Sequence, residues 1–152
     1  MRTIEDILRE QRFFAELDAS HQALIAGCAS NRACDAGTYL FREGGDADAF
    51  FVIRHGHVAL DIAVPGREPL VIATLGPGDV VGASWLIAPY RWRFGARAIE
   101  PARLVQIDAR CLRAKLDADH DFGYAMMSRF VPLLAERLQA TRLQLLDVYG
   151  RG

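Results

Sequence analysis

The sequence predicts a mainly β domain with flanking helices, in which short strands form a barrel or jelly roll and a long helix follows them. Its 152 residues are enough for one domain with a sizeable core. From about residue 32 to residue 108, short runs of β-branched and aromatic residues are separated by Gly, Pro and Asp. Apolar residues at helical spacing lie before this region and after it.

Composition and charge exclude several functional classes. Hydrophobic residues make up 51% of the chain and charged residues 24%, which is the profile of a soluble globular protein. The net charge is −1, so the overall basic balance typical of nucleic-acid-binding proteins is absent. No stretch approaches the ~18 consecutive apolar residues that a membrane-spanning helix needs, and we expect no membrane segment.

The N-terminal segment and the cysteines indicate a cytoplasmic protein. The segment "MRTIEDILREQRFF" has three acidic residues among its first ten and no apolar run, unlike a signal peptide. Cys28, Cys34 and Cys111 are an odd set without a CxxC pair, so free thiols are expected rather than a disulfide framework or a zinc site.

Residues 1–31 are expected to form the N-terminal helices. Ile4, Ile7 and Leu8 fall on one helical face. The stretch "DASHQALIAGCA" predicts a second helix, with Asp18 or Ser20 as its N-cap.

Residues 32–108 are expected to form the β-roll. Glycine- and proline-containing turns such as "GGDAD", "PGRE" and "GPGD" separate the strand candidates. These candidates are residues 38–43, 49–55, 57–64, 69–75, 79–82, 97–100 and 102–108.

Residues 109–149 are expected to form C-terminal helices. "ARCLRAKLDAD" and "HDFGYAMMSRF" predict two short helices, and Pro132 then begins or kinks a long helix that reaches about Tyr149. A heptad stripe favours a homodimer seam over the alternative, a helix packed on its own domain. The stripe consists of Met127, Val131, Leu134, Leu138, Thr141, Leu145 and Val148.

The order of these elements resembles the cyclic nucleotide-binding domain, above all the sensor half of the cAMP receptor protein family. The stretch "GTYLFREGGDADAFFVIRHGHVAL" is similar to that family's recurrent Gly, Glu-Gly-Asp, aromatic and Val-Ile pattern. "LGPGDVVG" is similar to the approach to its phosphate-binding cassette, and "LAERLQAT" to its dimerisation helix. The resemblance implies a double-stranded β-helix, or jelly roll, with a long C-terminal dimerisation helix, together acting as a stand-alone regulatory or sensor domain.

The cassette departs from the family pattern. In the family a Gly-Glu pair, a short helix and an Arg hold the cyclic phosphate and the ribose. Here the stretch reads "VVGASWLIAPYRWRFGARA": Gly82 matches, Ala83 stands in place of the Glu, and Trp85 replaces a small residue. The lost Glu removes a hydrogen bond to a charged group worth ~1.5–3 kcal/mol. Ordinary cAMP binding is therefore not expected.

The position of the phosphate-binding arginine depends on the alignment. Without a gap it falls on Trp92, and a shift of one residue gives Arg91 or Arg93. In an extended segment Arg91 and Arg93 share one face and Trp92 takes the other. If Trp92 faces the roll interior, both arginines face out; if it faces out, they face the cavity.

Two functions follow from these alternatives. In the first, a cyclic nucleotide or other phosphate-bearing ligand binds to candidate residues Gly82, Ala83, Ser84, Trp85, Arg91, Trp92, Arg93 and Thr141, the last of which matches a family residue that touches the adenine. In the second, Trp85 and Trp92 fill the pocket, and the degenerate roll is a protein-interaction or accessory subunit of a larger complex, for example a redox complex of the hydrogenase type.

Other site types are not expected. No nucleophile–base constellation, Walker loop or Rossmann loop is present, so the protein is not expected to be an enzyme. His55 and His57 lack a third metal ligand nearby. Transcription factors of the family carry a helix-turn-helix after the long helix, and nothing follows Gly152, so direct DNA binding is not expected.

Overall fold

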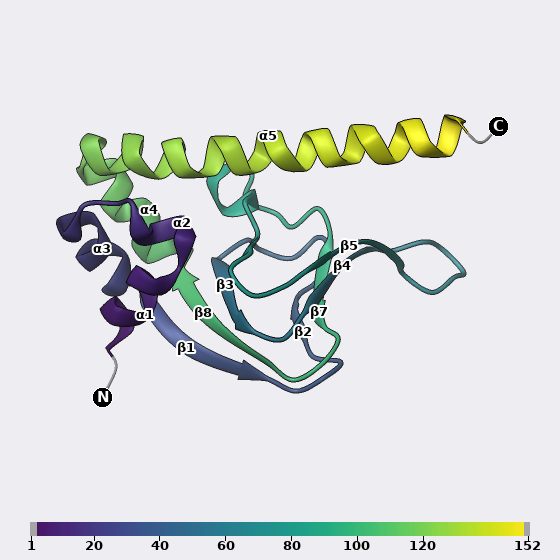
Figure 1. The fold of residues 1–152 in the computed structure, drawn as a ribbon, viewed down its shortest axis with the longest axis horizontal. Helices are drawn as coiled ribbons and strands as arrows, with labels where there is room; N and C mark the ends of the chain where they lie inside the picture. The colour runs from purple at the N-terminus through teal and green to yellow at the C-terminus, as the bar shows by residue number, and fades with distance from the viewer. Residues whose placement is uncertain (1–2, 151–152) are drawn as a thin grey trace.

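The computed structural model describes residues 3–150 and confirms the predicted β-roll with flanking helices (Figure 1). The helices are α1 (Ile4–Glu10), α2 (Arg12–Ala15), α3 (Ala19–Ala26), the 3₁₀ helix η1 (Ser84–Leu86), α4 (Ala109–Ala118) and α5 (His120–Gly150). The strands are β1 (Ala29–Cys34), β2 (Tyr39–Phe41), β3 (Ala49–His55), β4 (Val58–Ile62), β5 (Leu70–Leu75), β6 (Val80–Val81), β7 (Gly95–Ala98) and β8 (Ala102–Asp108).

Two antiparallel four-stranded sheets make the roll. One has the strand order β1-β8-β3-β6 and the other β2-β7-β4-β5. Inward-facing side chains from both sheets fill the space between them, as in other sandwiches and rolls. Phe51 and Phe41 meet there from opposite sheets, with ring centroids 6.1 Å apart. The cassette enters this core because it joins β6 of the first sheet to β7 of the second.

Strand β1 was not predicted as a strand. Three of the six residues in its sequence, "ASNRAC", are polar and only Cys34 is buried, so it carries no alternating hydrophobic signal. It forms because β8 supplies a complete antiparallel partner, with Ala29 opposite Ile107 and Cys34 opposite Ala102. β1 is thus an edge strand that is specified by its neighbour rather than by its own apolar pattern.

Pro132 does not begin a separate helix, because α5 is one helix of 31 residues that runs from His120 to Gly150 with Pro132 inside it. Figure 1 shows α5 running along the whole length of the molecule. Its first half lies over α1–α4, and its C-terminal half lies at the opposite end, where the β4–β5 hairpin also lies. Pro132 removes one backbone donor, but Phe130 before it is buried and Leu133 after it packs against the core. Tertiary packing on both sides therefore holds the helix through the proline.

Two different stripes run along α5. Phe122, Met126 and Phe130 are buried and fasten the first half of the helix to the domain. The apolar residues of the predicted seam lie on another face and are 38% to 67% exposed; they are Met127, Val131, Leu134, Leu138, Leu145 and Val148. The packing of α5 on its own domain therefore uses residues outside the heptad stripe.

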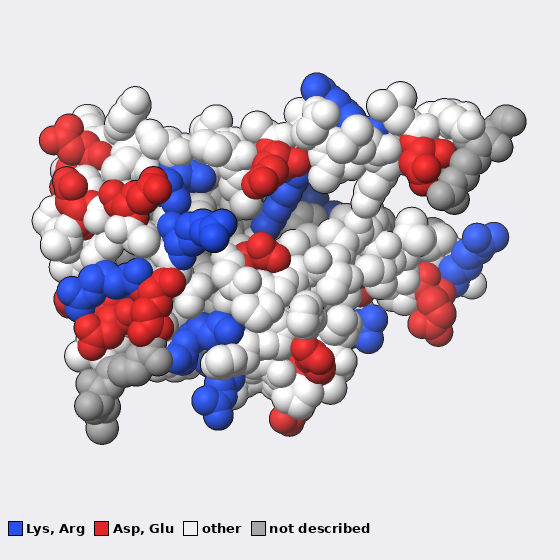
Figure 2. Space-filling model, in the orientation of Figure 1, with Lys and Arg blue, Asp and Glu red and all other residues white. Residues whose placement is uncertain are grey.

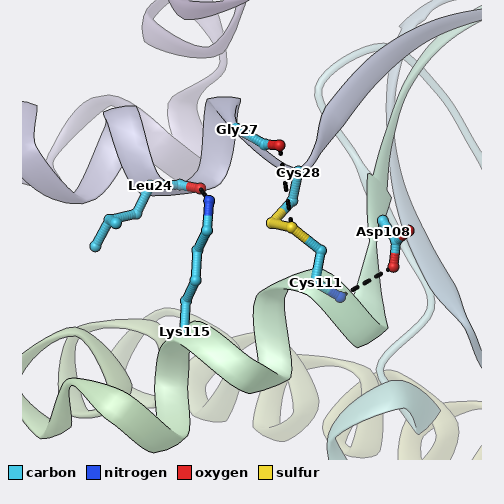
Figure 3. The surroundings of a disulfide bond; sticks show 6 residues. All are labelled: Leu24, Gly27, Cys28, Asp108, Cys111 and Lys115. Atoms are coloured by element: carbon cyan, nitrogen blue, oxygen red, sulfur yellow. Dashed lines mark hydrogen bonds between the residues drawn. A yellow bond between two sulfur atoms is a disulfide. The ribbon is translucent and has the colours of Figure 1, made fainter.

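The expectation of three free thiols is wrong, because Cys28 and Cys111 form a disulfide (Figure 3). Pairing of Ala29 with Ile107 and a hydrogen bond from Asp108 N to Cys28 O (2.8 Å) bring the start of β1 beside the start of α4. The two Cα atoms then lie 5.7 Å apart, within the range that a disulfide spans. Cys34 lies buried and outside this bond.

Candidate functional site

The cassette begins at a glycine that no other residue could replace without strain. Gly82 has φ = +100°, in the left-handed region that side chains disfavour. A Cβ atom at this position would lie 2.6 Å from Cη2 of Trp92. Gly82 therefore serves both the turn out of β6 and the close approach of the Trp92 ring.

Trp92 points into the roll. Its side chain is 3% exposed, and its ring stacks on Phe41 with centroids 3.5 Å apart and planes 8° from parallel. The backbone is fixed as well, since Trp92 N donates to Gly45 O (2.9 Å) and Gly44 N donates to Trp92 O (2.8 Å). The indole thus occupies the space between Phe41 and Gly82, next to the position where the resemblance puts a phosphate.

Arg91 and Arg93 point away from the roll interior, as expected when Trp92 faces inward. Both residues are exposed. Nη1 of Arg91 lies 3.1 Å from Oδ1 of Asp46 and 3.4 Å from the carbonyl oxygen of Gly44. An exposed ion pair of this kind contributes ~0–1 kcal/mol. The two arginines are therefore surface residues and do not line the roll interior.

Trp85 anchors the cassette to the helices. It is fully buried, stacked on Phe50 with ring centroids 4.8 Å apart and edge-on to Phe130 at 5.3 Å. Its carbonyl oxygen accepts a hydrogen bond from Nη1 of Arg113 in α4 (2.8 Å). The guanidinium of Arg113 also lies 4.4 Å from the ring centroid of Tyr90, so it ties both ends of the cassette loop to α4.

The remaining cassette residues offer few polar groups. Ala83 is buried and its side chain cannot accept a hydrogen bond, while Ser84 is half-buried. Their carbonyl oxygens are used in the turn itself, by the N–H groups of Leu86 (3.0 Å) and Ile87 (3.1 Å).

Arg137 of α5 reaches the base of the cassette, which sequence reasoning missed. Its Nη2 donates a hydrogen bond to the carbonyl oxygen of Val80, two residues before Gly82. Burial lowers the pKa of Arg137, and the negative charges of Asp79 and Glu136 oppose that shift. The hydroxyl of Thr141 is directed back along α5, where it donates to Arg137 O (2.9 Å). The sequence shows only how apolar and polar residues are spaced along this helix. That spacing gave no reason to expect a contact between Arg137 and the cassette.

Two surface hollows lie outside the interior of the roll. One, of about 640 Å³, is bounded by residues 10–13, the 77–80 turn and the side of α5 around Arg129 and Leu133. Another, of about 430 Å³, lies between Tyr90, Arg113 and Met127 at the junction of α4 and α5. Neither is lined by Gly82, Ser84 or Trp92.

The face shown in Figure 2 has no single dominant charge. In the view of Figure 2, acidic and basic side chains alternate over the N-terminal helices, and much of the edge formed by α5 carries neither. Within residues 3–150, no helix combines the length and apolar character needed to cross a bilayer. Nδ1 of His57 lies 2.6 Å from Oε1 of Glu100. One of the two histidines considered above as metal ligands therefore faces a carboxylate.

Comparisons with known proteins agree with this architecture. An uncharacterized Mycobacterium tuberculosis protein is 38% identical over 84 residues, which are 55% of this chain and 16% of that protein. The Arabidopsis thaliana cyclic nucleotide-gated ion channel 18 is 28% identical over 141 residues, 91% of this chain and 19% of the channel. The chain thus spans less than a fifth of these two relatives.

A solved structure covers nearly the whole chain. A Geobacter metallireducens GS-15 protein that carries the name of a cyclic nucleotide-binding protein superimposes with a TM-score of 0.80 at 29% identity, over 91% of this chain and 99% of that one. The cyclic nucleotide-binding domain family matches residues 31–119, which include the roll from the third residue of β1 onward, the cassette and α4. The chain therefore belongs to the cyclic nucleotide-binding domain family.

Proposed function

We propose that this chain is a regulatory domain whose roll does not take cAMP in the ordinary way and which acts as a homodimer through α5. The observation that carries the proposal is the Trp92 ring, packed between Phe41 and Gly82. The proposal assigns neither catalysis nor direct DNA binding to the chain.

The cost of reopening the site supports this proposal. A buried tryptophan removes about 150–250 Å² from water, which corresponds to about 4–6 kcal/mol at 25 cal/mol per Å². A nucleotide that displaced the Trp92 ring would lose affinity by about three to four decades. The missing carboxylate at Ala83 and the outward direction of Arg91 and Arg93 would weaken binding further.

Calorimetry with cAMP and cGMP tests the ligand side of the proposal. We expect no binding with a micromolar Kd to the wild-type chain, and the same result for Arg93→Ala, because Arg93 is exposed outside the roll. Micromolar binding of either nucleotide that is lost in Arg93→Ala would overturn the proposal. A raised melting temperature with a nucleotide would count against it in the same way.

The exposed seam supports the homodimer. Its six apolar side chains recur on one face of α5 at heptad spacing and remain 38% to 67% exposed within residues 3–150. A second copy is the occupant that matches this pattern, because two such stripes can pack knobs-into-holes along each other. Thr141 is the one polar position among them.

Light scattering tests the homodimer. We expect a dimeric mass for the wild-type chain and a monomeric mass for Leu138→Glu, because a carboxylate in a buried seam would be desolvated without a partner. Leu143→Glu is the matched control: Leu143 is 56% exposed on another face of α5, so this variant should remain dimeric. A monomeric wild type, or equal masses for the two variants, would exclude the seam.

The filled pocket also supports a second function, that of a protein-interaction or accessory subunit. Trp85 and Trp92 make the cassette part of the core, which leaves the surface of the roll and α5 as the functional parts. Purification of the chain from its source cells tests this second function. A protein partner is expected to co-purify with it in a fixed stoichiometry. Recovery of the chain alone, together with tight nucleotide binding, would exclude this function.

A further inference from the structure

We infer that the Cys28–Cys111 disulfide is a reversible redox site that sets how firmly α4 and the start of α5 are held to the N-terminal helices. This inference is independent of whether the roll binds a nucleotide. The reactants are dithiols and disulfides of the kind that exchange with protein cysteines.

The disulfide connects the end of α3 to the start of α4. Cys28 stands between α3 and β1, and Cys111 is the third residue of α4. Figure 3 shows Cys111 and Lys115 one turn apart on α4, both directed toward the end of α3. α4 is followed, after Asp119 alone, by α5. The disulfide therefore links the N-terminal helices covalently to the segment that leads into the long helix.

Cys111 is the more exposed of the two bonded cysteines. Cys28 is 7% exposed and belongs to the hydrophobic core, whereas Cys111 is partly exposed. On this inference an external thiolate approaches from the side of Cys111 and attacks its Sγ, and Cys28 is the leaving group. Cys34, the third cysteine, is buried in β1 at the far end of that strand and offers an internal control.

The exchange balances with a dithiol as the reductant. One thiolate of the dithiol attacks Sγ of Cys111, the Cys28–Cys111 bond breaks, and Cys28 leaves as a thiolate. The second thiolate of the reductant then attacks the reductant's first sulfur atom, which is bonded to Sγ of Cys111. The reductant closes into a disulfide, and Cys111 leaves as a thiolate. Two electrons pass to the protein, and the two protons lost by the reductant end on the two cysteines. A disulfide of the same class reverses the reaction.

Noncovalent contacts keep the end of α3 and the start of α4 together after the bond opens. Nζ of Lys115 donates to the carbonyl oxygen of Leu24 (2.7 Å). Gly27 makes room for that ammonium group, because a Cβ there would lie 2.7 Å from Nζ. The Asp108 carboxylate caps α4 through Cys111 N (3.1 Å). Reduction should therefore loosen α4 locally without unfolding the roll.

Opening of the disulfide would also weaken the attachment of α5. Arg129 in α5 donates to the carbonyl oxygens of Phe13 (2.7 Å) and Arg12 (3.1 Å) in α2, so the N-terminal helices hold α5 directly. α4 and α5 also pack on each other. With the disulfide closed, the N-terminal helices, α4 and α5 form one connected unit; with it open, that unit depends on hydrogen bonds and apolar contacts.

The experiment combines thiol trapping with hydrogen exchange on the full chain. Protein purified without reductant is quenched in acid, alkylated and digested, and a cross-linked Cys28–Cys111 peptide is expected. Graded glutathione buffers should convert it reversibly into two alkylated thiols. Dithiothreitol, used as the probe dithiol, should lower amide protection in α4 and the first turns of α5 by on the order of tenfold, with β3 and β8 unchanged.

Two variants separate the redox site from general effects. Cys111→Ser should show the reduced pattern of amide exchange and no response to dithiothreitol. Cys34→Ser should respond as the wild type does. The inference is overturned if Cys28 and Cys111 are both alkylated at the outset and no oxidant joins them. It is also overturned if reduction leaves α4 and α5 unchanged, or if it removes protection from β3 and β8, as loss of a purely structural bond would.

Discussion

Trp92→Ala is expected to lower the free energy of unfolding by about 3–5 kcal/mol, the cost of removing a large buried aromatic side chain. The ring is 3% exposed and stacked on Phe41, and a cavity between Phe41 and Gly82 would remain after its removal. Urea denaturation followed by circular dichroism measures the change without relying on tryptophan fluorescence.

Trp92→Phe is the matched control, because a phenyl ring keeps part of the stacking on Phe41 and should lose clearly less stability. Gly82→Ala gives an independent check of the same contact. Its Cβ would lie 2.6 Å from the Trp92 ring, so the substitution should cost less in a Trp92→Ala background than in the wild type. A loss below about 1 kcal/mol for Trp92→Ala would mean that the indole is not packed in the roll.

Phe130→Ala is expected to be equally destabilising, by about 3–5 kcal/mol, and to free α5 from the roll. Phe130 is fully buried, and its ring centroid lies 4.9 Å from that of Phe13, 5.2 Å from Phe50 and 5.3 Å from Trp85. This one side chain thus joins α2, β3, the cassette and α5. Hydrogen exchange should show the loss of protection spreading along α5.

Tyr124→Ala is the control on the same helix. Tyr124 is 77% exposed and precedes the first seam residue, Met127, so the substitution should change the stability of a single chain by about 0.5 kcal/mol or less. If Phe130→Ala and Tyr124→Ala had similar effects, the aromatic cluster would not be the attachment point of α5.

Much of the fold was predictable because its local signals agree. The runs around Phe50 and Val105 have strong β propensity and alternate with glycine turns, and they form β3 and β8 within the predicted ranges. β1 was missed because only one of its six residues is buried and its strand conformation depends on β8. The sequence left open whether Pro132 begins or kinks the long helix, because the packing at Phe130 and Leu133 that outweighs the local cost of proline is not visible in it.

The site was less predictable because it depends on contacts between distant segments. Alternation showed that Trp92 and its two arginines must face opposite ways, but not which way. The direction follows from Phe41 and Gly82, which are separated from Trp92 in sequence and meet it only after the two sheets pack. The Cys28–Cys111 bond spans 83 residues, so its partners become visible only once β1 and β8 pair.

The attachment of α5 at one end makes it a lever. At 1.5 Å per residue a helix of 31 residues is about 46 Å long. Its buried residues lie at positions 122 to 130, so the last 20 residues of the helix extend beyond the buried part. The part of α5 after Phe130 is about 30 Å long, so a tilt of about 5° at Phe130 would displace the far end by about 2.6 Å. A change too small to alter the roll could therefore be large at the tip of α5.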